Sequence, residues 1–426
     1  MPADEDFMFS PNRRRYRGRD LNRCLTIADL ERQAARRLPN FVFEYIQGGS
    51  EEEVALRNNR KIFDRWRFLT RSLCDVSGCS LETRILGQPS KLPLVIGPTG
   101  FAGLMWPEGD VALAAAAAEA GIPFTQSTVS NSPIASVAAS GIARHWFQLY
   151  AYDTPKLDAL LQRALDAGCE ALVVTTDSPV VSNREWDRRN YVSGISLDLR
   201  SRLDALCHPR WLTEHMIRRS IPLFENLIDL IDGEARDLMA MRRWLGQHMP
   251  TARTWDWLRS LRAKWPRKLI VKGILHLDDV GRAIDAGADG IVLSNHGGRQ
   301  MDRTVSPMEL LSDAREIAGR DFTILIDSGF RRGSEVVQAL ALGADAVLLG
   351  RATLYGLAAG GQAGVLRAIR IIEDELKRDL PLLGANRIAD LSPDMLIDSR
   401  TGHPAARRSD PASAGSGAYA VAAADR

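Results

Sequence analysis

The chain lacks several features that would mark whole classes of protein. No run of apolar residues approaches the roughly 18 that a membrane-spanning helix needs. The N-terminus lacks a charged start followed by an apolar core, so we expect no secretory signal. The net charge is only +2, which is too near neutral to suggest a partner nucleic acid. These absences favour a globular protein of the cytoplasm.

Cysteine is scarce, and the sequence has no metal or dinucleotide signature. The five cysteines show no paired spacing of the kind found in disulfide frameworks or metal sites, which indicates a reducing compartment and predicts no metal. A Gly-x-Gly-x-x-Gly fingerprint between a strand and a helix is also absent, so a dinucleotide at a helix start is not supported.

What the chain does have is a regular alternation of short apolar runs and helical patterns. Glycines recur where a helix would end before the next strand, at Gly121, Gly168, Gly287 and Gly343. Continuously apolar strands between helices predict a parallel sheet covered by helices, and eight of them close a (β/α)8 TIM barrel. The predicted strands are 94–97, 123–128, 146–150, 171–177, 268–272, 290–295, 322–327 and 346–351.

Three regions lie outside this alternation. Residues 1–25 are polar, with a basic run at 13–15, and are predicted to form a disordered arm, although a surface-binding tail is the alternative. Helical patterns within 26–66 predict an N-terminal helical cap on the barrel, and the barrel domain itself is expected to span 26–399. Residues 400–426 are rich in Ala, Ser and Gly, and are predicted to form a disordered tail.

An insertion follows the fourth predicted strand. The alternation breaks after Tyr191 and resumes near Thr254, and residues 196–250 carry apolar and basic residues in an amphipathic pattern. This pattern predicts one or two helices. They would serve as an active-site lid with a small core of its own, or as an interfacial membrane segment; both interpretations stay open.

The most informative stretch runs from Ser294 to Asp302, directly after the sixth predicted strand. His296 can take up a proton near neutral pH, and Arg299 offers a planar fork for a carboxylate. Gly297 and Gly298 between them allow the backbone to approach a flat ligand closely. A plain strand-to-loop turn with a solvated charge is the alternative, but a base, a cation and two glycines together favour a catalytic site.

Polar side chains also follow the other predicted strands. In a barrel the carboxyl ends of the strands meet at one face, which is where active sites lie. The turns after the seventh and eighth strands are rich in Gly and Arg, as phosphate-binding turns in such barrels are. Together these residues predict a flat, phosphate-bearing cofactor that accepts hydrogen bonds.

With these residues in view, the sequence resembles the FMN-dependent 2-hydroxy acid dehydrogenase and oxidase family over roughly residues 26–399. The resemblance rests on four stretches, 146–150, 271–273, 294–302 and 327–333. Further stretches resemble the (S)-mandelate dehydrogenase branch of the family, namely 96–100, 106–110, 207–211 and 350–357.

The resemblance implies a catalytic set and a reaction. His296 would be the proton acceptor in the oxidation of an (S)-2-hydroxy acid, mandelate-like, lactate or longer, to the 2-oxo acid. Asp177 would pair with His296 and favour the imidazolium. Arg184 and Arg299 would bind the substrate carboxylate, with Tyr150 near the hydroxyl or the carboxylate.

The resemblance also implies FMN as the cofactor and the residues that hold it. Lys272 would lie at the N1–O2 edge of the flavin and stabilise negative charge there. The other residues implied in FMN binding are Pro98, Thr99, Gly100, Ser127, Gln148, Thr175, Ser294, Asp327, Ser328, Gly329, Arg331, Gly350 and Arg351.

One position departs from the family pattern. Phe43 is expected to lie at the substrate site, where the family usually has a Tyr that donates a hydrogen bond to the substrate carboxylate. Tyr45, two positions on, is expected to face elsewhere on the same helix. This departure suggests a larger, more apolar hydroxy acid whose carboxylate is bound by the two arginines.

The electron acceptor and the partners follow from the resemblance in the same way. Dehydrogenases of the family pass electrons to membrane quinones, and the insertion predicts peripheral contact with the cytoplasmic face of the inner membrane. An oxidase that uses O₂ is the alternative. A phosphate-binding isomerase barrel or a non-catalytic relative would not need His296, Arg299 and Arg184 together. A homotetramer is expected by analogy with the family.

Overall fold

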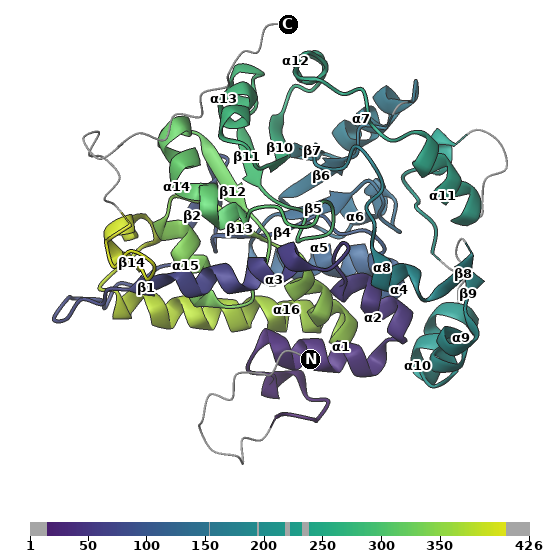
Figure 1. The fold of residues 1–426 in the computed structure, drawn as a ribbon, viewed down its shortest axis with the longest axis horizontal. Helices are drawn as coiled ribbons and strands as arrows, with labels where there is room; N and C mark the ends of the chain where they lie inside the picture. Colours follow the sequence, from purple (N-terminus) through teal and green to yellow (C-terminus); the bar gives the residue numbers. More distant parts are fainter. Residues whose placement is uncertain (1–14, 153, 194–195, 218–221, 232–237, 406–426) are drawn as a thin grey trace, which may run out of the picture.

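Eight parallel strands close into a barrel at the centre of the molecule, as the sequence predicted (Figure 1). The computed structural model describes residues 15–152, 154–193, 196–217, 222–231 and 238–405. The barrel closes where Val347 pairs with Leu94. Its strands in chain order are β4 (Leu94–Ile96), β5 (Phe124–Ser127), β6 (His145–Leu149), β7 (Ala171–Thr175), β10 (Lys268–Ile274), β11 (Gly290–Leu293), β12 (Thr323–Ile326) and β13 (Ala346–Leu349).

Apolar side chains fill the barrel because both faces of these strands are buried. Trp146, Ile270, Val292 and Leu348 belong to a buried cluster of the barrel strands. A hairpin of β2 (Thr83–Ile85) and β3 (Gln88–Ser90) adds Ile85 to the same cluster. The sequence did not predict this hairpin.

Helices surround the barrel, and one of them is unusually long. Helix α16 (Arg351–Leu382) follows β13 and lies against α1 and α5 (Figure 1). Its backbone leaves the helical conformation at Gly360 and Gly361. The other helices of this layer are α4 (Ala102–Met105), α5 (Gly109–Ala120), α6 (Ile134–Ala138), α7 (Leu157–Asp166), α12 (Trp255–Lys264), α13 (Leu277–Asp285), α14 (Pro307–Ala318) and α15 (Gly333–Ala341).

The predicted N-terminal helical cap is present. It consists of α1 (Ile27–Arg37), α2 (Asn40–Gln47) and α3 (Val54–Lys61). The third helix was expected to reach residue 66. Instead, a 3₁₀ turn η2 (Ile62–Arg65) leads into β1 (Trp66–Phe68), which pairs with β14 (Leu396–Asp398).

The chain is folded somewhat beyond the expected domain limits. A 3₁₀ turn η1 (Leu21–Arg23) precedes α1, and the buried Cys24 accepts hydrogen bonds from Arg367 at its carbonyl oxygen, at 2.9 and 2.7 Å. The expected arm therefore does not extend to residue 25. At the other end, 3₁₀ turns η5 (Ile388–Asp390) and η6 (Pro393–Met395) lead into β14, and Pro404 bridges back to Ile397. Residues 1–14 and 406–426 lie outside the described residues.

The insertion after β7 contains the predicted helices. Its elements are α8 (Glu185–Arg188), β8 (Tyr191–Ser193), β9 (Ser196–Leu197), α9 (Leu199–Leu206), α10 (Pro209–Leu212), η3 (Thr213–Ile217), η4 (Ile228–Leu230) and α11 (Leu238–Gln247). The indole of Trp211 donates to the carbonyl of Leu104 at 2.9 Å, and Arg37 forms an ion pair with Glu214, so the insertion is fixed to the barrel side. Residues 194–195, 218–221 and 232–237 lie outside the described residues.

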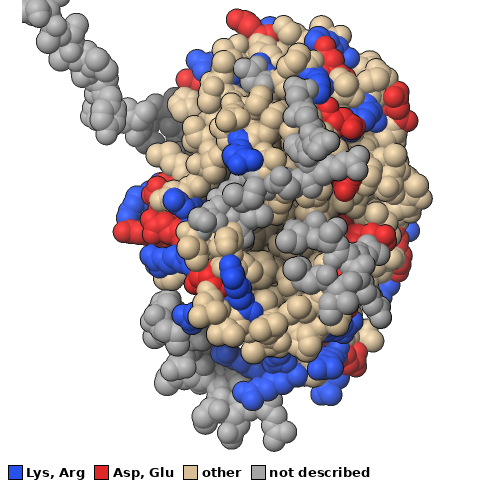
Figure 2. All heavy atoms as spheres, turned by 90° about the vertical axis from the view of Figure 1, so that its right-hand side faces the viewer, with Lys and Arg blue, Asp and Glu red and all other residues tan. Residues whose placement is uncertain are grey.

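The insertion side of the molecule has a distinct surface. Figure 2 shows a hollow surrounded mainly by uncharged described residues, with Lys and Arg gathered at the lower end, at the height of α9 and α10 in Figure 1. Within the described ranges, the structure has no helix long and apolar enough to cross a membrane.

Candidate active site

A cavity of about 1090 Å³ opens at the carboxyl ends of the barrel strands. Most of the predicted site residues lie on its wall, including His296, Arg299, Arg184 and Tyr150. The predicted residues that do not line it are Asp177, Ser294 and Phe43. The wall carries more cations than carboxylates, which suits an anionic ligand.

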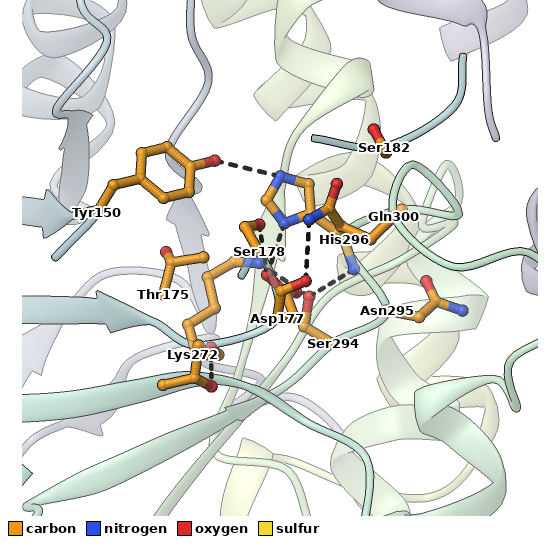
Figure 3. A network of polar contacts seen from close by, with 12 residues as sticks. Tyr150, Thr175, Asp177, Ser178, Ser182, Lys272, Ser294, Asn295, His296 and Gln300 are labelled. Atoms are coloured by element: carbon orange, nitrogen blue, oxygen red, sulfur yellow. Dashed lines mark hydrogen bonds and ion pairs between the residues drawn. The ribbon is translucent and has the colours of Figure 1, made fainter. Parts of the chain in front are cut away.

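His296 lies at the centre of a hydrogen-bonded group (Figure 3). Its Nδ1 is 3.0 Å from Oδ1 of Asp177, and its Nε2 is 3.4 Å from the hydroxyl of Tyr150. The expected pairing of His296 with Asp177 is therefore present, although the two residues are 119 positions apart. With Nδ1–H donating to the carboxylate, Nε2 is the ring nitrogen that is left to accept a proton.

The carboxylate behind His296 is held in its charged form. Burial acts to raise the pKa of Asp177, but His296, Lys272 and a hydrogen bond from Ser178 outweigh it, and the pKa lies below its usual value. Burial raises the pKa of Tyr150 well above its usual value, so this phenol stays protonated. The buried carboxylate of Asp177 is therefore an anionic acceptor at Nδ1 of His296.

A glycine makes room for this pair. Gly273 has φ +109°, and a Cβ there would lie 2.7 Å from the Cβ of Asp177. Only glycine combines this backbone conformation with such a close approach. The strand β10 has an irregular register between Lys272 and Ile274 at the same point.

Two arginines lie near His296 on different loops. Arg299 donates to the carbonyl of Gly48 at 2.8 Å, and Arg184 donates to Oγ of Ser182 at 3.0 Å. Burial lowers the pKa of Arg299 to about 9, and the neighbouring Arg184 acts in the same direction. An anion between the two guanidinium groups would relieve this repulsion.

Helix α2 presents Tyr45 to the cavity, which corrects the expectation for Phe43. Tyr45 lines the cavity, its hydroxyl is 3.5 Å from the carbonyl of Gly100, and Arg299 lies over its ring at 5.1 Å. Phe43 is directed elsewhere and packs beside Tyr355. Phe41 and Tyr45 are four residues apart and therefore share one face of the helix, a spacing that could have identified Tyr45.

A row of neutral polar groups runs along the ends of three neighbouring strands. Ser127 on β5 donates to the amide oxygen of Gln148 on β6 at 2.9 Å, and the amide nitrogen of Gln148 donates to Oγ1 of Thr175 on β7 at 2.9 Å. All three residues line the cavity. The strand register, with Ser127 opposite Gln148, places them side by side.

Lys272 continues this row on β10, where it is paired with Thr175 of β7. Its ammonium lies 3.0 Å from Asp327 and donates to Oγ of Ser294 at 2.8 Å. Ser294 therefore lies behind Lys272 and supports it. Burial acts to lower the pKa of Lys272, but Asp327 and Asp177 outweigh it and raise the pKa, so the side chain is a buried cation.

The Gly- and Arg-rich turns after β12 and β13 close the other end of the cavity. Arg351 donates to the carbonyls of Ile46, Gly297 and Gly48 at 2.8 to 2.9 Å. Arg331 donates to the carbonyl of its neighbour Phe330 at 2.8 Å, lies over the ring of Tyr355 at 5.3 Å and hydrogen-bonds the side chain of Tyr355. The remaining predicted residues on the wall are Pro98, Thr99, Gly100, Asp327, Ser328, Gly329 and Gly350.

These residues fit a flat cofactor that carries a phosphate. Ser127, Gln148 and Thr175 supply a row of hydrogen-bonding groups, and Lys272 supplies a buried positive charge at one end of that row. Arg331 and glycines line the turns where a phosphate would lie. The cavity is at the upper limit of typical small-molecule sites, about 300–1000 Å³, and has room for a cofactor and a substrate.

The fold and the site thus define an oxidoreductase barrel built around a phosphate-bearing cofactor. Residues 34–398 match the family of FMN-dependent dehydrogenases, and the chain belongs to that family. FMN is therefore its cofactor.

Individual relatives agree with this assignment. The (S)-mandelate dehydrogenase of Pseudomonas putida is 43% identical over 371 residues, which cover 87% of this chain and 93% of that protein. A putative L-lactate dehydrogenase of Mycobacterium tuberculosis is 42% identical over 385 residues, 88% of this chain and 89% of that one. The crystal structure of the monotopic membrane protein (S)-mandelate dehydrogenase matches with a TM-score of 0.85 and 42% identity, over 88% of this chain and 100% of that chain.

Proposed function

We propose that the protein oxidises an (S)-2-hydroxy acid to the 2-oxo acid, with His296 as the proton acceptor. The observation that carries this proposal is the imidazole of His296, hydrogen-bonded to the buried Asp177 and facing a cavity that Arg184 and Arg299 also line. The relatives named for mandelate and lactate support the same substrate class.

In this proposal His296 Nε2 takes a proton from the substrate, and the resulting imidazolium is stabilised by Asp177 through Nδ1–H. When bound, FMN would take up the two electrons and the second proton that leave the substrate, and this is the chemistry that the cofactor supplies. Tyr150 stays protonated and donates a hydrogen bond to an oxygen of the substrate.

The substrate carboxylate is assigned to Arg184 and Arg299, with the Tyr45 hydroxyl beside them. Burial and the neighbouring Arg184 lower the pKa of Arg299, so a carboxylate bound beside the two cations is favoured. The side group of the substrate is assigned to the apolar part of the cavity, which is lined by Leu104, Tyr152, Trp211, Leu212, Leu245 and Met249. This lining favours a substrate with a bulky apolar side group over glycolate, which has only a hydrogen atom at that position.

The FMN-binding residues are proposed from the same wall. Ser127, Gln148 and Thr175 would bond the flavin ring, Lys272 would supply a positive charge beside it, and Pro98–Gly100 would contact it. Asp327 and Ser328 would hold the ribityl chain, and Gly329, Arg331, Gly350 and Arg351 would hold the phosphate. Ser294 acts through Lys272.

An anaerobic titration tests the function. The purified yellow protein is mixed without oxygen with (S)-mandelate, (S)-lactate, a long-chain (S)-2-hydroxy acid and glycolate, and the flavin absorbance is followed. We expect bleaching by the bulky acids and weak bleaching by glycolate. A yellow protein that none of them bleaches contradicts the reaction, and equal kcat/KM for glycolate and a bulky acid contradicts the assignment of the apolar pocket.

Electrons are proposed to pass on to a quinone, because the dehydrogenase relatives are 43% and 42% identical to this chain, against 34% for a mandelate oxidase whose structure matches it over a similar length. The alternative acceptor is O₂, which would make the protein an oxidase. Readmitting air to the bleached protein separates the two: we expect the colour to return slowly in air and fast with a soluble quinone. Oxygen uptake at the rate of turnover contradicts the proposal.

Peripheral association with the cytoplasmic face of the membrane is proposed for the insertion. On α9, Leu199, Leu203 and Leu206 are 73%, 55% and 66% exposed and share a helix face, and Val180 and Val181 on the cavity wall are exposed nearby in the chain. Lys and Arg gather at the same height of this side (Figure 2). Apolar residues beside basic ones suit an anionic lipid surface.

Vesicle sedimentation tests the association. We expect the protein to bind anionic vesicles and to lose at least about tenfold in affinity when Leu199, Leu203 and Leu206 are changed to Ser, because each exposed Leu contributes hydrophobic transfer energy. The matched control changes Leu25, Leu73 and Leu382, which are exposed elsewhere in the chain, to Ser. Equal binding by both triple variants, or full recovery of the wild-type protein in the soluble fraction at low salt, contradicts the proposal. The homotetramer stays a prediction that sedimentation velocity can test.

A further inference from the structure

Ser178 makes a hydrogen bond that the proposed reaction leaves unused. Its hydroxyl donates to Oδ1 of Asp177 at 3.0 Å, the same oxygen that lies 3.0 Å from Nδ1 of His296 (Figure 3). Ser178 is itself only 6% exposed. Water therefore competes little for this bond, which the two neighbours make inside the protein.

The other carboxylate oxygen of Asp177 has no such support. Oδ2 is buried and has no hydrogen-bond partner among the described residues. All of the described side-chain hydrogen bonds of this carboxylate therefore fall on Oδ1, and they come from two donors, His296 and Ser178. Two donors on one oxygen fix its direction more firmly than one, and they divide its negative charge between them.

We propose that Ser178 is a positioning residue of this enzyme, which aims Oδ1 of Asp177 at His296 and moderates the negative charge that His296 meets. The inference rests on the proposed function, because it takes His296 as the proton acceptor. It adds a residue outside the set that contacts the substrate or the cofactor in that proposal.

Other polar and charged groups also lie around His296. The hydroxyl of Tyr150 lies at Nε2, Arg184 and Arg299 lie on the cavity wall, and Lys272 acts on Asp177 from β10. A substitution at Ser178 leaves these groups in place. It therefore changes one interaction of Asp177, and through it the balance between the neutral and protonated imidazole.

The variant Ser178→Ala tests the moderating role. Without the hydroxyl, Oδ1 carries more negative charge toward His296 and favours the imidazolium. A higher pH is then needed to deprotonate the imidazole. We expect the acidic limb of the pH profile of kcat/KM to move upward by about half a pH unit. Ser178→Thr keeps a hydroxyl at the same atom and should restore the wild-type limb.

Thr176→Val is the matched control on the other side of Asp177. The hydroxyl of Thr176 donates to the backbone carbonyl of Lys272 at 3.0 Å, so its loss removes a neighbouring hydrogen bond without touching the carboxylate. We expect the acidic limb to stay where it is in this variant. A merely structural role for Ser178 would make Ser178→Ala and Thr176→Val behave alike.

A second measurement covers the case in which Ser178→Ala loses activity. The ring-nitrogen NMR signals of the FMN-loaded protein are followed against pH, and the signal of His296 among the seven histidines is identified by its loss in His296→Asn. The titration midpoint should move upward in Ser178→Ala. An unmoved or lowered midpoint, or an unmoved acidic limb, overturns the role of Ser178. A wild-type enzyme without an acidic limb contradicts the proposed function itself, so the two failures are distinguishable.

Discussion

His296 combines a strained backbone with a functional side chain. Its φ of 57° lies in the left-handed region, and its amide donates to Oγ of Ser294 at 3.0 Å, which is the atom that also accepts from Lys272. Non-glycine residues adopt this conformation at a cost, and they cluster at functional sites. One serine thus links the backbone of the proposed base to the buried cation.

His296→Asn is expected to lower kcat by at least about 10²-fold, which is the lower range for removing a general base. Asn tolerates the left-handed conformation and can donate to Asp177, so the fold and the FMN content should be kept. Anaerobic single-turnover bleaching measures the loss. His276→Asn is the control, since His276 is exposed and caps α13, a role in which Asn is equally good. Comparable bleaching rates in both variants contradict the role of His296.

Tyr45 and Phe43 give opposite predictions. Tyr45→Phe removes a hydroxyl from the cavity wall beside Arg299, and we expect KM to rise about tenfold with a smaller change in kcat, as for a lost hydrogen bond to a charged group. Phe43→Leu should leave KM unchanged and lower the stability by about 1 kcal/mol through its contact with Tyr355. The reverse pattern in steady-state kinetics would restore Phe43 as the substrate-facing residue.

At the scale of elements, the sequence predicted what depends on local patterns. The barrel strands are buried on both faces, and most of them appear as continuous apolar runs, whereas β5 (Phe124–Ser127) is buried although three of its four residues are polar. The β2–β3 hairpin escaped notice because its strands are three residues long and mostly polar, as in Gln88–Ser90. The rotation of α2 about its axis, which points Tyr45 inward and Phe43 away, depends on packing against the barrel and cannot be derived from the helical pattern alone.

Helix α5 begins with a buried carboxylate that predicts a pH-dependent stability. Asp110 accepts from the amide of Asn131 at 3.1 Å, and its other oxygen is buried without a partner among the described residues. Burial raises the pKa of Asp110 from 3.8 to about 6. The folded protein therefore binds this proton more tightly than the unfolded chain, and the stability that protonation contributes is lost as pH rises from about 4 to about 6.

Asp110→Asn should stabilise the protein more at pH 8 than at pH 5, by a difference of about 1–2 kcal/mol, because the amide keeps the acceptor and cannot ionise. Thermal unfolding of the FMN-loaded protein at both pH values measures it. Asp158→Asn in the first turn of α7 is the control: this carboxylate is exposed and paired with Lys264, so no pH-dependent gain is expected. A gain that is equal at both pH values contradicts the ionisation argument.

The whole molecule brings the site together from residues far apart in the chain. Single strand ends could be predicted to be polar, and their shared face followed from the barrel. The contact of His296 with Asp177, 119 positions away, needed the closed barrel as well as the glycine that makes room at Gly273. The two arginines of the Gly-rich turns were expected to act alike, but only Arg351 ties α2 to the loop of His296 through three carbonyls.

The different contacts of Arg331 and Arg351 lead to a prediction about how FMN stabilises the folded protein. A ligand that binds only the folded state adds about 1.4 kcal/mol for each tenfold rise in free ligand above Kd, or about 2 °C in Tm for a chain of this size. Riboflavin lacks the phosphate and should stabilise less at equal concentration. In Arg331→Met the two ligands should become more nearly equal, and the Tm of the apoprotein should fall less than in Arg351→Met, because Arg331 bonds to its neighbour Phe330 and to Tyr355 and does not join α2 to the loop of His296.

Arg351→Met should behave differently, since it removes the three carbonyl contacts and lowers the Tm of the apoprotein itself. Thermal unfolding of the two variants over a range of FMN and riboflavin concentrations separates the phosphate contact from the structural one. If Arg331→Met keeps the full preference for FMN over riboflavin, the phosphate is bound by the backbone of the Gly-rich turns and by Arg351 alone. The assignment of Arg331 would then be wrong, while the cofactor and the barrel that holds it would stand.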